Sequence, residues 1–327
     1  MHRLYKYYPP ETALNVLQQQ TLRFSAPHLL GELFCPDHNA EVDFSAGELI
    51  HWLSDYLVEL LFAESSPAPR TTSTPLLQTL LQWRDTDHFK SRAEAYQHLQ
   101  PLIRPLVRHF FIHAEDSLNQ WRYFARQVRI GCYCQQPDNL FAWQHYGDQH
   151  RGIALGFTRA KFSKGMISRP LSYHPQPARL IDAQPQLDRI AASEFVAPRQ
   201  NEFIELLCHK SLDQQQEAEW REFKLPAQDE SGDCNIQDCR YWYNEETFSK
   251  QSLEALYIGA ATDISWQRSL IEFTKKHYPS TDIYRWSPAP GQYALQRETL
   301  HTGQQPSGEP PILTSTVNAP EQTRPHQ

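Results

Sequence analysis

Charged side chains alternate in the segment EAEWREF, residues 217–223, where Glu217, Glu219 and Arg221 occupy every second position. In an extended strand these three side chains point to one face. Two carboxylates and a guanidinium are costly to bury unless they serve each other or a ligand. One interpretation is therefore a solvated helix face or an exposed strand edge. The other is a site in which Glu219 binds a ribose hydroxyl and stabilises an oxocarbenium ion, with Glu217 beside it, as carboxylates do in glycosyl chemistry.

A second group of ligand-binding side chain types lies in the segment WQHYGDQH. We expect a helix over residues 138–150, in which Trp143, Tyr146 and His150 fall at positions i, i+3 and i+7 and share one face. That face could simply be packed, with the polar tips of Tyr and His reaching partners. We favour the alternative, in which Phe141 supplies the core face. Trp143 and Tyr146 then line a cleft beside the charged row and wall a planar ring such as nicotinamide or adenine.

The elements that must position these residues alternate between short strands and helices. Strands are expected at residues 3–8, 21–25, 128–134, 152–157, 166–174, 218–225, 253–260, 281–287 and 292–300. They come from both ends of the chain, with helices between them, so the fold class is α+β with a central mixed or antiparallel sheet. Strand 3–8 should join one sheet with a strand from the second half of the chain.

Residues 45–127 have mostly helical periodicity, with leucines at helical spacing after a capping box formed by Ser45 and Glu48. Pro101 and Pro105 interrupt the last helix of this stretch, which predicts a kink or a break there. We interpret 45–127 as a helical insertion in a single domain spanning 1–300. Residues 301–327 lack periodicity and are rich in Pro, Ser, Thr and Gln, which predicts a disordered tail.

Composition excludes several classes of protein. The net charge of −7 argues against nucleic acid as the main partner, and no apolar run is long enough to span a membrane. The start MHRLYKYYPPE lacks the apolar core of a signal peptide, and the six cysteines are scattered, so we expect a cytoplasmic protein. Cys234 and Cys239 lack two further ligands at a recognisable spacing, so no metal site is expected. The oligomeric state is left open.

The order of these motifs resembles the bacterial family catalogued as domain of unknown function 2971, whose members include proteins found near phage-defence loci. The matching elements are LYKY (4–7), TLRFSAP (21–27), WQHYGDQHRGIALGF (143–157) and the alternating charges of 217–221. Two departures argue against the Gly31–Leu33 turn and the Lys210 region as working parts. The family's Asn-Asp-Pro is Leu30-Gly31-Glu32-Leu33 here, and a Trp usual after Lys210 is absent.

A more distant likeness to the ADP-ribosyltransferase fold implies an activity. By that likeness Tyr5 or Lys6 on the first strand, Ser25 on the second and Glu219 on a late strand would hold NAD, a small-molecule nucleotide. Arg221 and Lys6 would bind its phosphates. The resemblance thus implies an NAD- or nucleotide-handling enzyme in a defence or toxin context. The alternative is a non-catalytic ligand- or protein-recognition module in which the charged row is a structural network.

Overall fold

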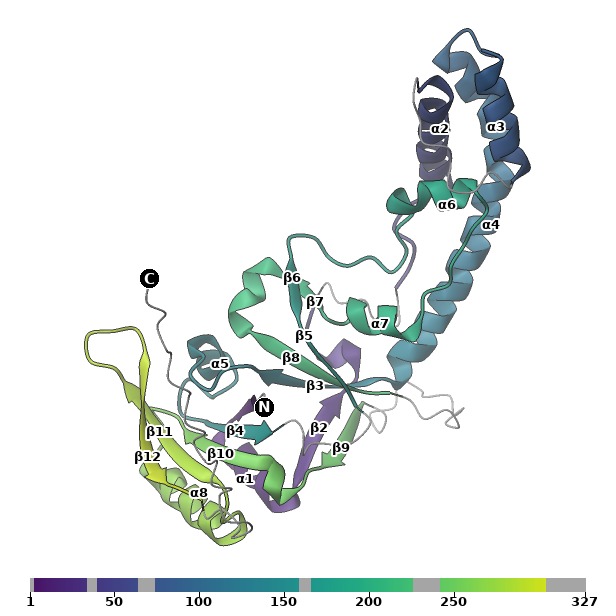
Figure 1. The fold of residues 1–327 in the computed structure, drawn as a ribbon. Coiled ribbons are helices and arrows are strands. Elements are labelled where there is room, and N and C mark those ends of the chain that lie inside the picture. Colours follow the sequence, from purple (N-terminus) through teal and green to yellow (C-terminus); the bar gives the residue numbers. More distant parts are fainter. Residues whose placement is uncertain (1–2, 34–39, 64–73, 159–165, 226–241, 304–327) are drawn as a thin grey trace, which may run out of the picture.

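The computed structural model describes residues 3–33, 40–63, 74–158, 166–225 and 242–303 of the chain. It consists of a mixed β-sheet with flanking helices and a long helical arm that projects from the sheet (Figure 1). The predicted α+β class is therefore confirmed. Over the described residues, no helix combines the length and the apolar character needed to cross a membrane. The predicted disordered tail lies outside the described residues from residue 304 onward.

In the described part of the chain, ten strands form the main sheet. Their order is β12-β11-β10-β4-β1-β3-β2-β9, with β8 beside β3 and β5 beside β8. Their bounds are β1 (Arg3–Tyr8), β2 (Thr21–Ser25), β3 (Arg129–Cys134), β4 (Ile153–Thr158), β5 (Ile167–Pro170), β8 (Glu219–Lys224), β9 (Tyr243–Thr247), β10 (Leu253–Ile258), β11 (Asp282–Pro288) and β12 (Leu295–His301). β1 pairs along its whole length with β4 and touches β3 at Tyr5 and Cys134. The same sheet contains β10 and β11, so the prediction that strand 3–8 shares a sheet with strands from the second half is confirmed.

The two faces of the sheet have different covers because side chains alternate along each strand. On one face Leu4 and Leu155 pack with α1 (Pro10–Gln19) and α8 (Ile264–His277). On the other face Tyr5, Tyr7 and Tyr257 pack with the short helix α5 (Leu140–His145). α5 therefore lies on the aromatic face of the sheet.

The sheet forks at β3. Cys134 pairs with Tyr5 of β1 on one edge and with Glu219 of β8 on the other. Four residues earlier in β3, Ile130 pairs with Ser25 of β2, on the same edge of β3 that β1 occupies at Cys134. β1 and β2 thus share one edge of β3, and β1 diverges from β3 beyond the single Tyr5–Cys134 pair. The candidate site described below lies at this fork.

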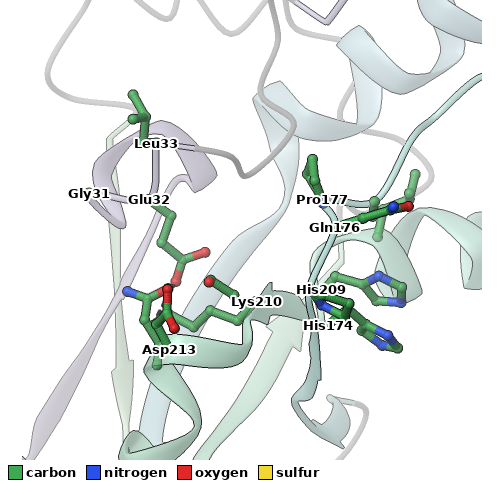
Figure 2. Close-up of a pocket in the computed structure, with 14 residues that line it drawn as sticks. Gly31, Glu32, Leu33, His174, Gln176, Pro177, His209, Lys210 and Asp213 are labelled. Atoms are coloured by element: carbon green, nitrogen blue, oxygen red, sulfur yellow. Dashed lines mark ion pairs between the residues drawn. The ribbon is translucent and has the colours of Figure 1, made fainter.

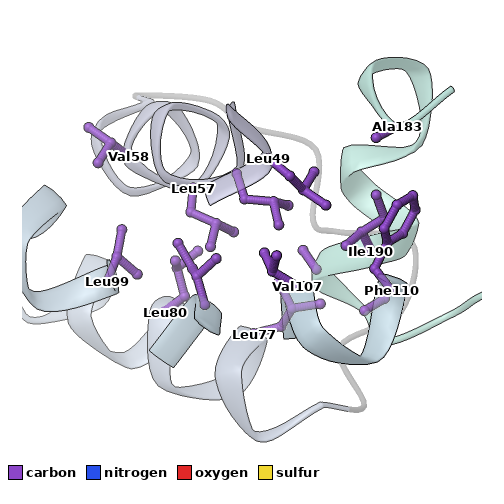
Figure 3. Packing of buried hydrophobic residues seen from close by; sticks show 14 of the residues in the cluster. Leu49, Leu57, Val58, Leu77, Leu80, Leu99, Val107, Phe110, Ala183 and Ile190 are labelled. Carbon is purple, nitrogen blue, oxygen red and sulfur yellow. The ribbon is translucent and has the colours of Figure 1, made fainter. Parts of the chain in front are cut away.

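The arm contains α2 (Ala46–Phe62), α3 (Pro75–Asp85) and the 36-residue α4 (Arg92–Gln127), which has a length of roughly 54 Å at 1.5 Å per residue. Ser45 and Glu48 form the predicted capping box at the start of α2. The arm has its own apolar core, shown in Figure 3, to which Leu49, Leu57 and Val107 belong. α6 (Leu187–Ala191) adds Ile190 to this core, so the arm draws on residues beyond the predicted insertion 45–127.

We predicted a kink or a break at Pro101 and Pro105, and a break does not occur, because α4 runs through both prolines as one helix. A proline inside a helix removes a hydrogen bond and costs about 3 kcal/mol. Leu99, Ile103 and Val107, spaced four residues apart across the prolines, are all buried in the arm core. Their burial offsets that cost, since each buried apolar side chain contributes about 1.5–3 kcal/mol.

A small parallel pair, β6 (Ser172–His174) with β7 (His209–Ser211), connects the arm side of the molecule to the fork. α7 (Gln200–Leu206) precedes β7 and packs on the C-terminal part of α4 through Phe203 and Trp121. A 3-10 helix, Leu212–Glu217, follows β7 and leads directly into β8. This connection brings the charged residues of 210–221 back over the fork.

Candidate functional site

The backbone conformation of Ala218 determines how the side chains of Glu217 and Glu219 are oriented relative to each other. The 3-10 helix ends at Glu217, Ala218 adopts a left-handed conformation with φ 45°, and β8 begins at Glu219. Glu219 and Arg221 therefore share one strand face as predicted. Glu217 would share this face only if the chain were extended from residue 217 onward, and that condition is not met. The Glu217 carboxylate reaches the same place from the end of the 3-10 helix.

Two side chains from elsewhere complete a cluster of five charged groups: Glu32, Lys210, Glu217, Glu219 and Arg221, named here the charge cluster. Lys210 Nζ lies 2.9 Å from Glu219 Oε2 and 3.2 Å from Glu32 Oε1, and it also donates to Glu217. Arg221 Nε donates to Glu219 Oε1 at 2.8 Å, and its Nη2 pairs with Glu32. Figure 2 shows Glu32 and Lys210 pointing toward each other from the two sides.

The two glutamates of the 217–221 row have pKa values shifted in opposite directions. Burial alone would raise the pKa of Glu219, but the charges of Arg221 and Lys210 outweigh it and lower that pKa to about 2. Burial raises the pKa of Glu217, and the neighbouring Glu219 charge adds to the effect against the opposing contact with Lys210. Two adjacent carboxyl groups with pKa values shifted in opposite directions form a pair suited to acid–base work.

A cavity of about 240 Å³ opens beside these carboxylates at the fork and is named here the fork cavity. Its walls are Tyr5, Lys6, Tyr7, Leu30, Glu32, Cys132, Tyr133, Cys134, Tyr146, Lys210, Glu217 and Glu219. Residues of β1 and β3 line it at the point where those strands diverge. The cavity therefore exists because β1 leaves β3 after a single residue pair.

The aromatic wall of the fork cavity carries neutral phenols. Burial raises the pKa of Tyr5 to about 12, and burial with the nearby Glu217 charge raises the pKa of Tyr146 as well. Lys6 donates from Nζ to the Cys132 carbonyl at 3.2 Å and lies 4.9 Å from the ring centroid of Tyr133. Burial lowers the pKa of Lys6. Tyr5, Lys6 and Tyr146, three predicted ligand-binding residues, thus meet at one cavity with Glu217 and Glu219.

The helix that was expected over 138–150 is shorter, and this reverses the roles of its aromatic residues. α5 ends at His145, and Asp148, Gln149 and His150 all have positive φ. Trp143 is 0% exposed and donates from Nε1 to the Pro137 carbonyl at 2.9 Å, whereas Phe141 is only partly buried. The prediction that Trp143 walls the cleft is wrong. Tyr146, 49% exposed, does line the cavity.

Two more predicted ligand-binding residues are placed away from the fork cavity. The His150 ring stacks with that of Trp143 at a centroid distance of 6.5 Å, and burial lowers the pKa of His150. Ser25 pairs with Ile130 in the backbone register, at the opposite end of β3 from Cys134. Neither His150 nor Ser25 is among the described residues that line this cavity.

Arg221 is fully buried and is not among the described residues lining the cavity. Its guanidinium donates to Glu219, Glu32 and the Leu207 carbonyl. The predicted role of Arg221 in binding phosphate is therefore not available in this arrangement. Its role is to position the carboxylate of Glu219.

Hydrogen bonds of the Asn139 side chain connect α5 to the backbone at Gln216, next to Glu217. Asn139 Oδ1 accepts from Ala142 N as the helix cap, and its Nδ2 donates to the Gln216 carbonyl at 2.7 Å. Cys134 Sγ also contacts the Glu217 carbonyl oxygen at 2.8 Å. These bonds hold the backbone around Glu217 against both β3 and α5, which fixes the position of its carboxylate at the cavity.

Glu32 and Lys210 are the residues that sequence reasoning set aside. Both were discounted because their surroundings depart from the family pattern, yet Lys210 contacts three carboxylates. The charge of the 217–221 row could have indicated Lys210. Two carboxylates and one guanidinium leave one negative charge in excess, and when the row is buried a further cation must balance that charge. Among the described residues no group of three His, Cys, Asp or Glu side chains is arranged to hold a metal ion. Cys234 and Cys239 lie outside the described residues.

Comparison of the chain with protein-family models, with curated proteins and with solved structures finds no match. The resemblance to the family of unknown function and the likeness to the ADP-ribosyltransferase fold therefore stay predictions from the residues.

Proposed function

We propose that the fork cavity is the active site of an enzyme that cleaves the N-glycosidic bond of a cationic nucleotide such as NAD. One observation carries the proposal. Glu217 and Glu219 both contact Lys210, and both line the fork cavity beside its tyrosine rings. Their pKa values are shifted in opposite directions. Glycosyl chemistry needs one permanently ionised carboxylate and one that exchanges a proton.

Glu219 is suited to the permanent anion. Its pKa of about 2 keeps it ionised throughout the physiological range. Arg221 and Lys210 make three contacts with its two oxygens, and a carboxylate offers about four acceptor positions. Glu219 lines the fork cavity, where a ribose hydroxyl would compete with the Cys132 thiol for the remaining acceptor position. The fixed negative charge then lies where positive charge develops on the sugar, a preorganised arrangement that stabilises the transition state.

Glu217 is suited to the proton exchange. When the bond between C1 of the ribose and the ring nitrogen breaks, its electron pair goes to the nitrogen and neutralises the pyridinium. A water or acceptor hydroxyl then forms the new bond to C1, and its proton passes to the Glu217 carboxylate and on to solvent. With water the overall reaction converts NAD and water into ADP-ribose, nicotinamide and a proton.

The cavity's charge and walls favour a substrate with a cationic ring, such as the pyridinium of NAD. Among the described lining residues, three carboxylates face two ammonium groups, and four tyrosine rings supply negative π faces. A volume of about 240 Å³ lies below the roughly 300–1,000 Å³ of sites for drug-sized ligands. The cavity therefore fits one ring with its sugar, and the phosphates would lie outside it. On the family resemblance, we place this activity in the bacterial cytoplasm, in a defence or toxin context.

The test is incubation of the full chain with NAD while released nicotinamide is measured by chromatography. Glu219→Gln should lower kcat by about 100-fold or more, since it removes the transition-state charge. Tyr146→Ala, which alters a half-exposed wall residue, should raise KM and leave the fold intact. Glu298→Gln, which removes an exposed carboxylate on β12, is the matched control and should be fully active. Turnover that survives Glu219→Gln would refute the proposal.

A non-catalytic recognition module is the second candidate, favoured by the internal pairing of the charge cluster. Glu219 and Arg221 contact each other, and Lys210 is shared by three carboxylates, as in a structural network. This candidate predicts no nicotinamide release from NAD. It also predicts that Glu219→Gln does not change this result, whereas the stability lost with the buried charge is expected under either candidate.

A further inference from the structure

A second and larger cavity of about 430 Å³ lies on the other side of Glu32 and Lys210, between the Gly31–Leu33 turn and the β6–β7 pair. It is named here the histidine cavity. Figure 2 shows Glu32, Lys210 and Asp213 on one side of it and His174, His209, Gln176 and Pro177 on the other. Its volume is within the roughly 300–1,000 Å³ of small-molecule sites. Glu32 and Lys210 are the two described residues that line both cavities.

Two stacked imidazoles distinguish this cavity. In the parallel register of β6 and β7, Ser172 pairs with His209 and His174 with Ser211, so the two histidines are diagonal neighbours on one face. Their ring centroids are 4.4 Å apart with an interplanar angle of 22°. Burial and the neighbouring His174 lower the pKa of His209, which favours its neutral form. A stacked pair of this kind offers a flat surface to a further ring.

The charges around the cavity disfavour an anion. Besides the histidines, Lys210 is the single cationic side chain among the described residues that line it, and its ammonium contacts three carboxylates. Glu32 and Asp213 add two carboxylates to the same wall. A phosphate needs free charged or backbone donors, whereas a neutral ring does not.

Polar and apolar groups are both present, as a nucleobase requires. Pro175, Pro177 and Leu206 supply apolar wall, while Ser211 and Gln214 supply a hydroxyl and an amide. An apolar cleft with a few convergent polar groups is the usual form of a small-molecule site. Donors and acceptors on the edge of a heteroaromatic ring can be matched by these side chains and by the Asp213 carboxylate.

We infer that the histidine cavity binds a neutral planar heteroaromatic base, of the kind carried by nucleosides, stacked on the His174–His209 pair. The inference does not require that the fork cavity cleaves a glycosidic bond.

The experiment uses the full chain with adenosine, guanosine, cytidine and uridine as separate probes, and with AMP and inorganic phosphate for the charge argument. Saturation-transfer NMR should show stronger transfer to base protons than to ribose protons for at least one nucleoside. Calorimetry should give that nucleoside an affinity equal to or greater than that of AMP, and no binding of phosphate. His209→Ala should weaken binding about 10-fold or more, because a stacking ring is lost.

His209→Phe keeps an aromatic ring and should retain affinity within about 3-fold. The matched control is His277→Ala, which removes an imidazole stacked on Phe273 at 4.4 Å but far from the cavity in the fold, on α8. Its affinity should be unchanged. Circular dichroism of each variant separates loss of binding from loss of folding.

Three results would overturn the inference. The first is no binding of any of the four nucleosides at millimolar concentration. The second is binding that is unchanged in His209→Ala and lost in Tyr146→Ala, which would locate the ligand in the fork cavity. The third is phosphate or AMP binding more tightly than the nucleosides. Nicotinamide release from NAD by the His209→Ala variant reports on the proposed activity separately, so the two ideas fail by different measurements.

Discussion

Replacement of Glu219 by Gln tests whether the charge cluster is assembled as described. The substitution keeps the side-chain shape and removes one charge from a carboxylate held by Arg221 at 2.8 Å and Lys210 at 2.9 Å. An amide can accept from only one of these cations, since its other end is a donor. The remaining cation loses a partner inside the protein, which is costly.

The size of the effect follows from the pKa. Lowering the pKa of Glu219 from 4.5 to about 2 means that the folded protein favours the ionised carboxylate by roughly 3 kcal/mol, at about 1.4 kcal/mol per pH unit. Because the folded pKa is the lower one, this stability is complete above about pH 5 and is lost as the pH falls toward 2. We therefore expect Glu219→Gln to lower the free energy of unfolding by roughly 3 kcal/mol at pH 7, and by less than half of that at pH 3.

Urea denaturation of both proteins at pH 7 and pH 3, followed by tryptophan fluorescence, measures this difference. Glu298→Gln breaks an exposed pair with Arg285 and should cost at most about 1 kcal/mol at pH 7. If Glu219→Gln costs no more than this control, or costs the same at both pH values, the carboxylate is not held between the two cations. The reasoning about the site would then be refuted.

Two further predictions concern the frame around the site. Trp143→Ala should lower the free energy of unfolding by about 3–5 kcal/mol, because a fully buried indole is lost, whereas Phe141→Ala should cost distinctly less; thermal unfolding of both variants checks this order. Gly152→Ala should be strongly destabilising, since a Cβ atom there would lie 2.3 Å from the Tyr8 carbonyl oxygen. Gly47→Ala, whose nearest contact would be 3.7 Å away in α2, should be neutral or slightly stabilising; equal melting temperatures for the two glycine variants would contradict this packing.

Local sequence determined the elements and part of the site. The short strands, the capping box at Ser45 and the shared face of Glu219 and Arg221 follow from periodicity and from hydrogen bonds within a few residues. The α+β class follows from the same patterns. The grouping of Tyr5 and Lys6 with Glu219 came from the likeness to the ADP-ribosyltransferase fold and not from local patterns.

Local patterns misled where the chain turns. The 3.6-residue period predicted a helix through His150, but α5 ends at His145 and residues 148–150 have positive φ. Trp143 packs in the core against Tyr7 of β1. At Pro101 and Pro105 the local rule predicted a kink or a break, and burial of the residues on either side of the prolines keeps α4 unbroken. In both cases tertiary packing energies exceed the local preference.

The composition of the charge cluster was decided by tertiary structure alone. Arg221 and Glu32 are 189 positions apart, and only the fork of the sheet and the β6–β7 connection bring the 30–33 turn and Lys210 to the same carboxylates. A buried charge must find an opposite charge wherever the fold supplies one, at any sequence separation. Sequence spacing specifies the face on which a charge lies, and the sheet topology specifies its partner.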